Sequence, residues 1–276
     1  MKKFFSGLKT DPINTLADWQ DSRWPWGIIA FAMIAMVLLA HYVFQDWMHM
    51  LPCEQCVYIR YGNLVMALGC IIAMINPKAL WAKVVGYVIS LYGLVYTIMC
   101  SWKLIGIHDA VHSDDPMAMF GMQGCSTEPH FPFGLPLEKW APAWFQPTGD
   151  CGYDAPVVPD GAVLSDLQRW FIELYQSSDG WYLIPQWKFM DMASCCLLAC
   201  IVAAIFLAAM IFGWVTRDLV RKAYFRFVLL HRLLRLLLTS RPEHGDKSGA
   251  APNLSSLSCV TIDLQPVRRH AVSKVR

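Results

Sequence analysis

The sequence predicts an all-α membrane protein: a bundle of four transmembrane helices, with both termini cytoplasmic and a long outer loop between helices three and four. Three observations predict this fold: the composition, four long apolar stretches, and the placement of Lys and Arg around them. Hydrophobic residues make up 56% of the 276 residues and charged residues only 16%, against roughly 45–50% and 25% in soluble proteins. Such a chain suits lipid better than water. Its net charge of +2 gives no indication of nucleic-acid binding.

Four apolar stretches are long enough to cross the hydrocarbon core of a bilayer, which takes about 17–25 helical residues. They cover about 26–45, 57–75, 84–102 and 188–214. Trp24, Trp26 and Trp47 bracket the first stretch in the manner of an interfacial aromatic belt. This stretch is too long for the core of a signal peptide, and no small-residue cleavage site follows it. We therefore expect it to be a membrane span.

Lys and Arg residues gather on one side of these stretches. They precede the first stretch, separate the second from the third, and follow the fourth: Lys2, Lys3, Lys9, Arg23, Lys78, Lys83, Arg217, Arg221, Lys222 and Arg226. The opposite segments, about 46–56 and 105–187, are mostly acidic. Because positively charged loops stay in the cytoplasm, we predict a cytoplasmic segment 1–24, a membrane domain 25–215 and a cytoplasmic tail 216–276.

Two segments outside the spans have a helical pattern. Residues 167–175 are predicted to form a short amphipathic helix in the outer loop. Residues 217–238 combine basic residues with leucine runs, which is typical of a helix along an anionic membrane face. From residue 240 onward, Pro, Gly, Ser and charged residues dominate, so disorder is expected.

The main chemical motif is Pro-Cys-Glu-Gln-Cys, residues 52–56, at the outer start of the second stretch. The spacing of Cys53 and Cys56 lets two sulfurs bond across one helical turn, and a helix N-terminus stabilises a thiolate. The same spacing supplies half of a zinc site, but no second Cys-x-x-Cys is present. An oxidising outer compartment favours redox chemistry. We predict a redox pair and no metal site.

Arg60 lies four residues after Cys56, one turn deeper on the same helix face. A cation within a span is unfavourable by about 2.5–3.5 kcal/mol at the helix centre and by less near the interface. Arg60 is therefore either a snorkelling side chain or a residue that stabilises a nearby negative charge. Its closeness to Cys56 favours the second interpretation.

Cys125 and Cys151 lie in the long outer loop, where an oxidising compartment favours a disulfide. Closing a loop of this size stabilises a fold by roughly 3–4 kcal/mol, so the pair is either a structural disulfide or part of the redox chemistry. Four outer cysteines permit three connectivities, of which the two local pairs are the simplest. The cysteines within apolar stretches are expected to act as small hydrophobic residues.

These motifs resemble the DsbB family of bacterial disulfide-forming membrane proteins. The resemblance covers roughly residues 25–215. It includes the Cys-x-x-Cys with Arg60, the run Phe131–Trp140 continuing to Gly149-Asp150-Cys151, and Ile184–Trp187 before the last span. The Pro-Cys-Glu-Gln-Cys motif and the long outer loop look closer to the DsbI subgroup.

The resemblance implies a quinone-dependent protein-disulfide oxidoreductase of the bacterial inner membrane, with its active cysteines on the periplasmic side. A periplasmic thioredoxin-fold dithiol oxidase, DsbA-like or DsbL-like, would attack Cys125 and form a mixed disulfide. The released Cys151 would attack Cys53, and Cys56 would pass the electrons to ubiquinone or menaquinone, assisted by Arg60.

Two histidines are further candidates for the quinone site. His108 and His112 lie one helical turn apart just past the third stretch, and the resembling family has a comparable histidine in this region. Packing at the membrane interface explains them equally well.

Other functions stay open at this point. A quinone reductase similar to vitamin K epoxide reductase has a comparable bundle, but its Cys-x-x-Cys is expected late in the chain. A non-catalytic scaffold with two structural disulfides would not need Arg60 beside the motif. A zinc-binding membrane protein is a more distant alternative.

Overall fold

The computed structural model describes residues 7–115, 117, 125–178 and 180–239. The chain forms two compact units, Met1–Phe225 and Arg226–Arg276. Of the second unit, the described residues comprise the end of one helix. The predicted disorder after residue 240 falls outside the described residues, and the predicted division at 24 and 215 stays a prediction.

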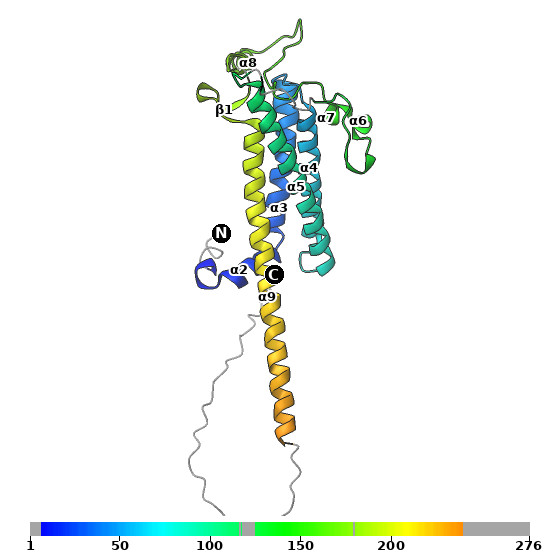
Figure 1. The fold of residues 1–276 in the computed structure, drawn as a ribbon, viewed down its shortest axis with the longest axis vertical. Helices are drawn as coiled ribbons and strands as arrows, with labels where there is room; N and C mark the ends of the chain where they lie inside the picture. Colours follow the sequence, from blue (N-terminus) through cyan, green and yellow to red (C-terminus); the bar gives the residue numbers. More distant parts are fainter. Residues whose placement is uncertain (1–6, 116, 118–124, 179, 240–276) are drawn as a thin grey trace, which may run out of the picture. The chain divides into compact units, whose positions relative to one another are not determined.

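Four long helices lie side by side in the first unit (Figure 1). They are α3 (Trp24–Leu38) with its π-helical continuation η1 (Leu39–Trp47), α4 (Glu54–Ile75), α5 (Leu80–Val111) and α9 (Met192–Thr239), whose last residues belong to the second unit. By length and composition, Trp24–Trp47, α4, α5 and Met192–Arg221 are candidate membrane spans. The chain is thus a mostly helical, multi-pass membrane protein, as predicted. The assignment of its two sides stays a prediction.

Side chains from all four helices form the core of the bundle. Trp26 of α3, Met66 of α4, Tyr87 of α5 and Leu207 of α9 are buried against one another in one apolar cluster. The opposite faces of the same helices carry exposed apolar residues such as Phe31. In a membrane these faces contact lipid, so the exposed apolar surface carries no penalty.

Several predicted boundaries were wrong by a few residues. α4 begins at Glu54 because the Cys53 sulfur caps its first turn. α5 continues to Val111 because Leu104 and Ile107 are buried against the outer loop. α9 begins at Met192 because the residues before it form a strand. The segments between the long helices are therefore 48–53 and 112–191. The loop bounds of about 46–56 and 105–187, and the side on which these loops lie, stay predictions.

The outer loop has its own structure at one end of the bundle (Figure 1). Its elements are η2 (Pro132–Gly134), α6 (Leu137–Trp140), α7 (Pro142–Phe145), α8 (Asp166–Ser177), β1 (Tyr182–Ile184), η3 (Pro185–Trp187) and β2 (Phe189–Asp191). The strands pair antiparallel, with Tyr182 opposite Asp191. Helix α8 confirms the predicted amphipathic helix, and the Ser165 side chain caps it by accepting from the backbone N of Gln168.

At the other end, an ion-pair cluster joins the helix α2 (Pro12–Gln20) to two spans. Asp21 contacts Lys83 of α5 and Arg217 of α9, the latter at 2.8 Å. Burial alone would raise the pKa of Asp21, but hydrogen bonds from both cations outweigh it and hold the pKa below its usual value. The structure thus brings together cations that the sequence assigns to one side of the membrane.

Helices α4 and α5 pack with their backbones in close contact. A Cβ on Gly93 of α5 would lie 2.5 Å from the backbone N of Met66 and 2.6 Å from the carbonyl oxygen of Gly62, both in α4. Small residues permit such close approach between membrane helices. Since the two contacting atoms belong to the backbone, they have little room to move away.

Gly93→Ala is therefore expected to destabilise the bundle by about 1–3 kcal/mol through overpacking. The matched control is Gly106→Ala on the same helix, where a new Cβ meets no atom within 4 Å and Ala favours the helix. Thermal unfolding of the purified protein in detergent measures both variants. Equal melting temperatures would contradict close packing at Gly93.

Candidate functional site

The Cys-x-x-Cys pair lies at the N-terminus of α4. Cys53 is the N-cap residue, and its sulfur accepts a hydrogen bond from the backbone N of Cys56 at 3.3 Å. Both cysteines are free, with their Sγ atoms 2.7 Å apart. The hydrogen bond with the Cys56 sulfur, together with burial, raises the pKa of the Cys53 thiol well above its usual value. Cys53 therefore keeps its proton at neutral pH, within reach of Cys56 for disulfide formation.

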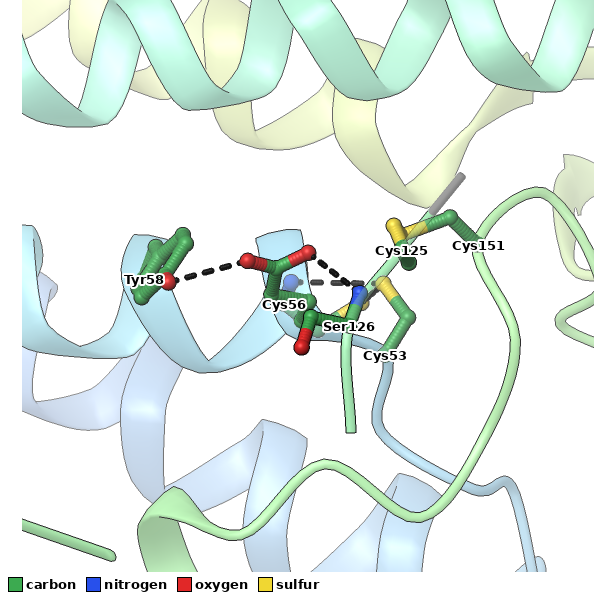
Figure 2. Close-up of a disulfide and its surroundings, with 7 residues drawn as sticks. Cys53, Cys56, Tyr58, Cys125, Ser126 and Cys151 are labelled. Atoms are coloured by element: carbon green, nitrogen blue, oxygen red, sulfur yellow. Dashed lines mark hydrogen bonds between the residues drawn. A yellow bond between two sulfur atoms is a disulfide. The ribbon is translucent and has the colours of Figure 1, made fainter. Parts of the chain in front are cut away.

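A disulfide joins Cys125 and Cys151 beside this pair (Figure 2). The four outer cysteines belong to one apolar cluster with Leu104 and Ile107 of α5. Cys151 is only 7% exposed, whereas Cys125 is partly exposed. Of the two disulfide-bonded residues, Cys125 is therefore the more exposed, and Cys151 is enclosed with Cys53 and Cys56.

Glu54, between the two cysteines of the motif, holds the Cys125 side of the outer loop. Its carboxylate accepts hydrogen bonds from the backbone N of Ser126 at 2.8 Å and from the Tyr58 hydroxyl at 2.9 Å (Figure 2, dashed lines). The Tyr58 hydroxyl accepts in turn from the backbone N of His130 at 2.7 Å. Helix α4 thus holds the chain just after Cys125 at two points.

Pro52, the first residue of the motif, holds the Cys151 side of the outer loop. The backbone N atoms of Thr148 and Gly149 donate to the carbonyl oxygen of Pro52 at 2.9 and 3.1 Å. A Cβ on Gly149 would lie 2.7 Å from the carbonyl oxygen of Leu51, so only Gly fits here without a shift. Both ends of the disulfide are therefore tied to the turn that carries the thiols.

Glu54→Ala removes two of these contacts and is expected to slow thiol–disulfide exchange between the two cysteine pairs by about tenfold or more, because misplaced reactants lose rate steeply. After partial reduction with dithiothreitol, alkylation at timed intervals and mass analysis measure the exchange. The control is Glu173→Ala, an exposed residue of α8. Equal exchange rates in both variants would show that Glu54 does not position the disulfide.

An apolar cavity of about 370 Å³ lies beside Cys56. Residues of α3, η1, α4, α9 and the outer loop line it, and its polar lining residues are Cys56, Arg60, Asn63, Asp154, Cys195 and Cys196. Asn63 is 2% exposed, and its Oδ1 atom has no hydrogen-bond partner among the described residues. A largely apolar cavity of this size with a few polar groups is typical of a small-molecule site.

Arg60 is buried at this cavity and does not extend to water. It is 5% exposed, and its guanidinium donates to Gln45 Oε1 at 2.8 Å and to the carbonyl oxygens of Trp144 at 3.1 Å and Ala40 at 3.3 Å. Two of these acceptors belong to the π-helical segment η1, a type of helix often found at functional sites. All three acceptors are neutral, so the guanidinium brings its full positive charge to the cavity.

The two candidate histidines lie elsewhere. His108 is inside α5, not past it, and lines a second cavity of about 30 Å³ that also contacts Cys53 and Cys56. His112 is the C-cap of α5 and stacks on His108, with ring centroids 4.2 Å apart. Neither is among the described residues that line the larger cavity. Their part in quinone binding stays a prediction.

Asp154 lines both cavities, and sequence reasoning did not select it. Its Oδ1 atom lies 3.8 Å from His108 Nε2, and within the described part of the chain neither atom has a hydrogen-bond partner. Burial raises the pKa of Asp154 to about 6. The outer loop has many acidic residues, so only the fold distinguishes this one.

The chain is similar to known proteins along most of its length. A family model described as disulfide bond formation protein DsbB matches residues 22–212. The chain belongs to the DsbB family. This confirms the resemblance predicted over roughly residues 25–215.

Two curated DsbB-family relatives are similar along nearly their whole length. Protein-disulfide oxidoreductase DsbI of Salmonella typhi is 52% identical over 214 residues, which cover 78% of this chain and 95% of the relative. The putative protein-disulfide oxidoreductase DsbI of Campylobacter fetus subsp. fetus is 55% identical over 215 residues, covering 78% and 98%. The names agree with the predicted DsbI subgroup.

Sequence reasoning missed several polar residues of this DsbB-family site. Glu54 lies within the Pro-Cys-Glu-Gln-Cys motif, so its position between the two cysteines could have indicated that it belongs to the site. Gln45 and Asn63 carried no comparable signal, because single polar residues near span ends are common. Among the described residues, no group of three or more His, Cys, Asp or Glu could hold a metal ion.

Proposed function

We propose that this DsbB-family chain is a protein-disulfide oxidoreductase that oxidises a periplasmic thioredoxin-fold dithiol and passes the electrons to a membrane quinone. The observation that carries the proposal is the order of the sulfurs: reachable Cys125, buried Cys151 and Cys53, then Cys56 at an apolar cavity. The names of the two relatives, both protein-disulfide oxidoreductases, support the reaction class.

The first half of the reaction is thiol–disulfide exchange. A thiolate of the reduced partner attacks Cys125, the bond to Cys151 breaks, and Cys151 leaves as a thiolate. Cys151 then attacks Cys53 of an oxidised Cys53–Cys56 pair, and Cys56 is released. The second partner thiol attacks the partner sulfur that is bound to Cys125, which frees the oxidised partner with Cys125 as the leaving thiolate. Cys125 then attacks Cys151, which restores the Cys125–Cys151 disulfide and releases Cys53. The free Cys53 and Cys56 in the structure correspond to the state before electrons leave for the quinone.

The larger cavity fits a quinone ring. A quinone supplies a two-electron acceptor with two carbonyl oxygens, and the cavity has Arg60 and Asn63 one turn apart to meet such oxygens. The unpartnered Asn63 Oδ1 is a hydrogen-bond acceptor, so it would pair with a hydroxyl of the reduced quinol, whereas the quinone oxygens would accept from Arg60. The guanidinium of Arg60 would stabilise negative charge on Cys56 and on a carbonyl oxygen.

A neighbouring apolar groove suits an isoprenoid tail. It lies along α3 and α9, has a volume of about 420 Å³, and shares Met36, Leu183, Cys195 and Ala199 with the cavity beside Cys56. A lipid-soluble quinone, ubiquinone or menaquinone, would thus enter from the bilayer with its tail along this groove.

The orientation follows from charge. The loops that carry the four outer cysteines are acidic, and the opposite end carries Lys83 and Arg217. Because positively charged segments stay in the cytoplasm, the reactive cysteines would face the periplasm of a bacterial inner membrane. A DsbA-like or DsbL-like dithiol oxidase could then reach Cys125.

The experiment supplies the purified full-length chain in detergent with a reduced thioredoxin-fold dithiol and a short-chain ubiquinone or menaquinone analogue, and follows quinone absorbance. Turnover is expected for the unaltered protein and for Cys70→Ser, a buried cysteine that contacts Ser90, and not for Cys56→Ser. If neither quinone is turned over and the Cys125–Cys151 disulfide resists reduction, a structural scaffold is favoured instead.

A further inference from the structure

The side chain of Asp154 bridges the two cavities of the site. Cys56 and Asp154 both line the large apolar cavity and the small one, whereas Cys53 and His108 line only the small one. Asp154 is therefore the one carboxyl among the described lining residues that borders both the dithiol and the proposed quinone site. Nothing in the thiol-exchange chemistry above uses it.

The two-electron reaction also has to move protons. Oxidation of two thiols to a disulfide releases two protons, and reduction of a quinone to a quinol takes up two. The raised pKa of Cys53 means that its proton is still on sulfur when the reaction begins. The lining of the large cavity is mostly apolar, so these protons need a carrier at its wall.

We propose that Asp154 carries protons from the Cys53–Cys56 dithiol to the quinone, with His108 as the group that exchanges protons with it across the small cavity. This inference rests on the proposed function and names a further residue of the same reaction.

The atoms and electrons balance. The Asp154 carboxylate accepts a proton from a thiol, the S–S bond forms, and two electrons pass to the quinone. The protonated carboxyl then donates to a quinone oxygen and returns to a carboxylate. His108 takes the proton of the second thiol before the S–S bond forms and later passes it through Asp154 to the other quinone oxygen, so the net change is dithiol plus quinone to disulfide plus quinol.

The geometry of the small cavity supports the exchange between Asp154 and His108. Its volume of about 30 Å³ exceeds the roughly 10–15 Å³ that a cavity needs to hold one water molecule. His108 Nε2 and Asp154 Oδ1, 3.8 Å apart and both without a described hydrogen-bond partner, supply two polar groups to hold that water. A bridging water joins them into a proton path.

The carboxyl is also suited to accept and release protons near neutral pH. Burial raises its pKa to about 6 from an ordinary 3.8, and hydrogen bonds from the backbone N atoms of Trp181 and of Asp154 itself partly offset the increase. The titratable groups that face it are His108 of α5 at 3.8 Å, Cys56 of α4, His112 at the C-cap of α5, which lowers its pKa, and Asp191 of β2, which raises it. The charged side chains of Asp109, Asp191 and Lys188 interact electrostatically with His108.

The test measures kcat for quinone reduction between pH 5 and pH 8 with the full-length chain in detergent. For the unaltered protein, kcat is expected to fall as the pH drops through about 6, because a protonated Asp154 cannot accept a proton. In Asp154→Asn, which keeps an acceptor for Trp181, kcat should fall by about 10²-fold and the acidic limb should vanish. Asp154→Glu should restore part of the lost kcat and part of the acidic limb.

Neighbouring variants give directional controls. His112→Gln should move the midpoint of the acidic limb to higher pH and Asp191→Asn to lower pH, because His112 lowers the pKa of the carboxyl and Asp191 raises it. Asp160→Asn, an exposed residue of the same loop, should leave the profile unchanged. Formation of the mixed disulfide at Cys125 should be normal in all these variants.

Two outcomes would overturn the inference while leaving the proposed function intact. One is an Asp154→Asn variant with kcat and acidic limb like those of the unaltered protein. The other is a uniform loss of kcat with the limb retained, which would indicate a structural role. If the unaltered protein exchanges disulfides but reduces no quinone, the proposed function fails and the proton carrier fails with it.

Discussion

Only Cys125 is expected to form a covalent complex with the partner. The partner is a thioredoxin-fold variant that keeps only its attacking cysteine, which is bound to thionitrobenzoate as a mixed disulfide. When Cys151→Ser is mixed with this partner, the Cys125 thiol should displace coloured thionitrobenzoate and form a covalent complex. With Cys125→Ser, neither should occur. The reason is exposure, since Cys125 is partly exposed and Cys151 is 7% exposed and enclosed with the thiols.

When the reduced partner is the electron donor, both single variants should also reduce quinone only at the uncatalysed rate. The reason is that electrons from the partner enter only through the Cys125–Cys151 disulfide. Non-reducing gel electrophoresis measures the complex, and absorbance measures thionitrobenzoate. The two variants carry the same number of cysteines, so each is the control for the other. A complex that forms equally well with Cys151 would contradict the assigned order of sulfurs.

Arg60→Met is expected to lower kcat for quinone reduction by about 10²-fold, the usual effect of removing one preorganised donor for developing negative charge. Met keeps much of the length of the side chain and loses the charge. The change also removes the donor for Gln45, Trp144 and Ala40, so some loss of stability will accompany it.

The control for Arg60→Met is Lys103→Met, which removes an exposed cation of α5 at the same end of the bundle. It should leave kcat and the KM for quinone unchanged. Exchange between the partner and Cys125 should be normal in both variants, since Arg60 acts at the cavity and not at the loop. A folded Arg60→Met variant with unchanged kcat and KM would show that Arg60 takes no part in quinone binding or reduction.

The spans and the cysteine motif could be predicted because each has a local signal. Apolar length marks a span wherever it occurs in the chain. The Cys-x-x-Cys with Arg60 is contained within eight residues, so its geometry on one helix face follows from helical periodicity. The family followed from these motifs, and the match over residues 22–212 confirms it.

The residues that complete the site could not be predicted because non-local contacts place them. Asp154 reaches the cavities only because the Cys125–Cys151 loop is tied back to Pro52 and Glu54. Gln45 meets Arg60 because η1 is π-helical, a feature that apolar periodicity does not reveal. The end of α5 was placed too early because Lys103 resembles a span end, whereas the helix continues to pack Ile107 under the outer loop.

The most direct test of the central claim isolates the second half of the reaction. A Cys125→Ser, Cys151→Ser double variant is reduced, freed of reductant and mixed anaerobically with one equivalent of quinone. The account predicts one quinol formed for each Cys53–Cys56 disulfide, read by quinone absorbance and by mass after alkylation. Quinone that stays oxidised while both thiols remain open to alkylation would contradict it.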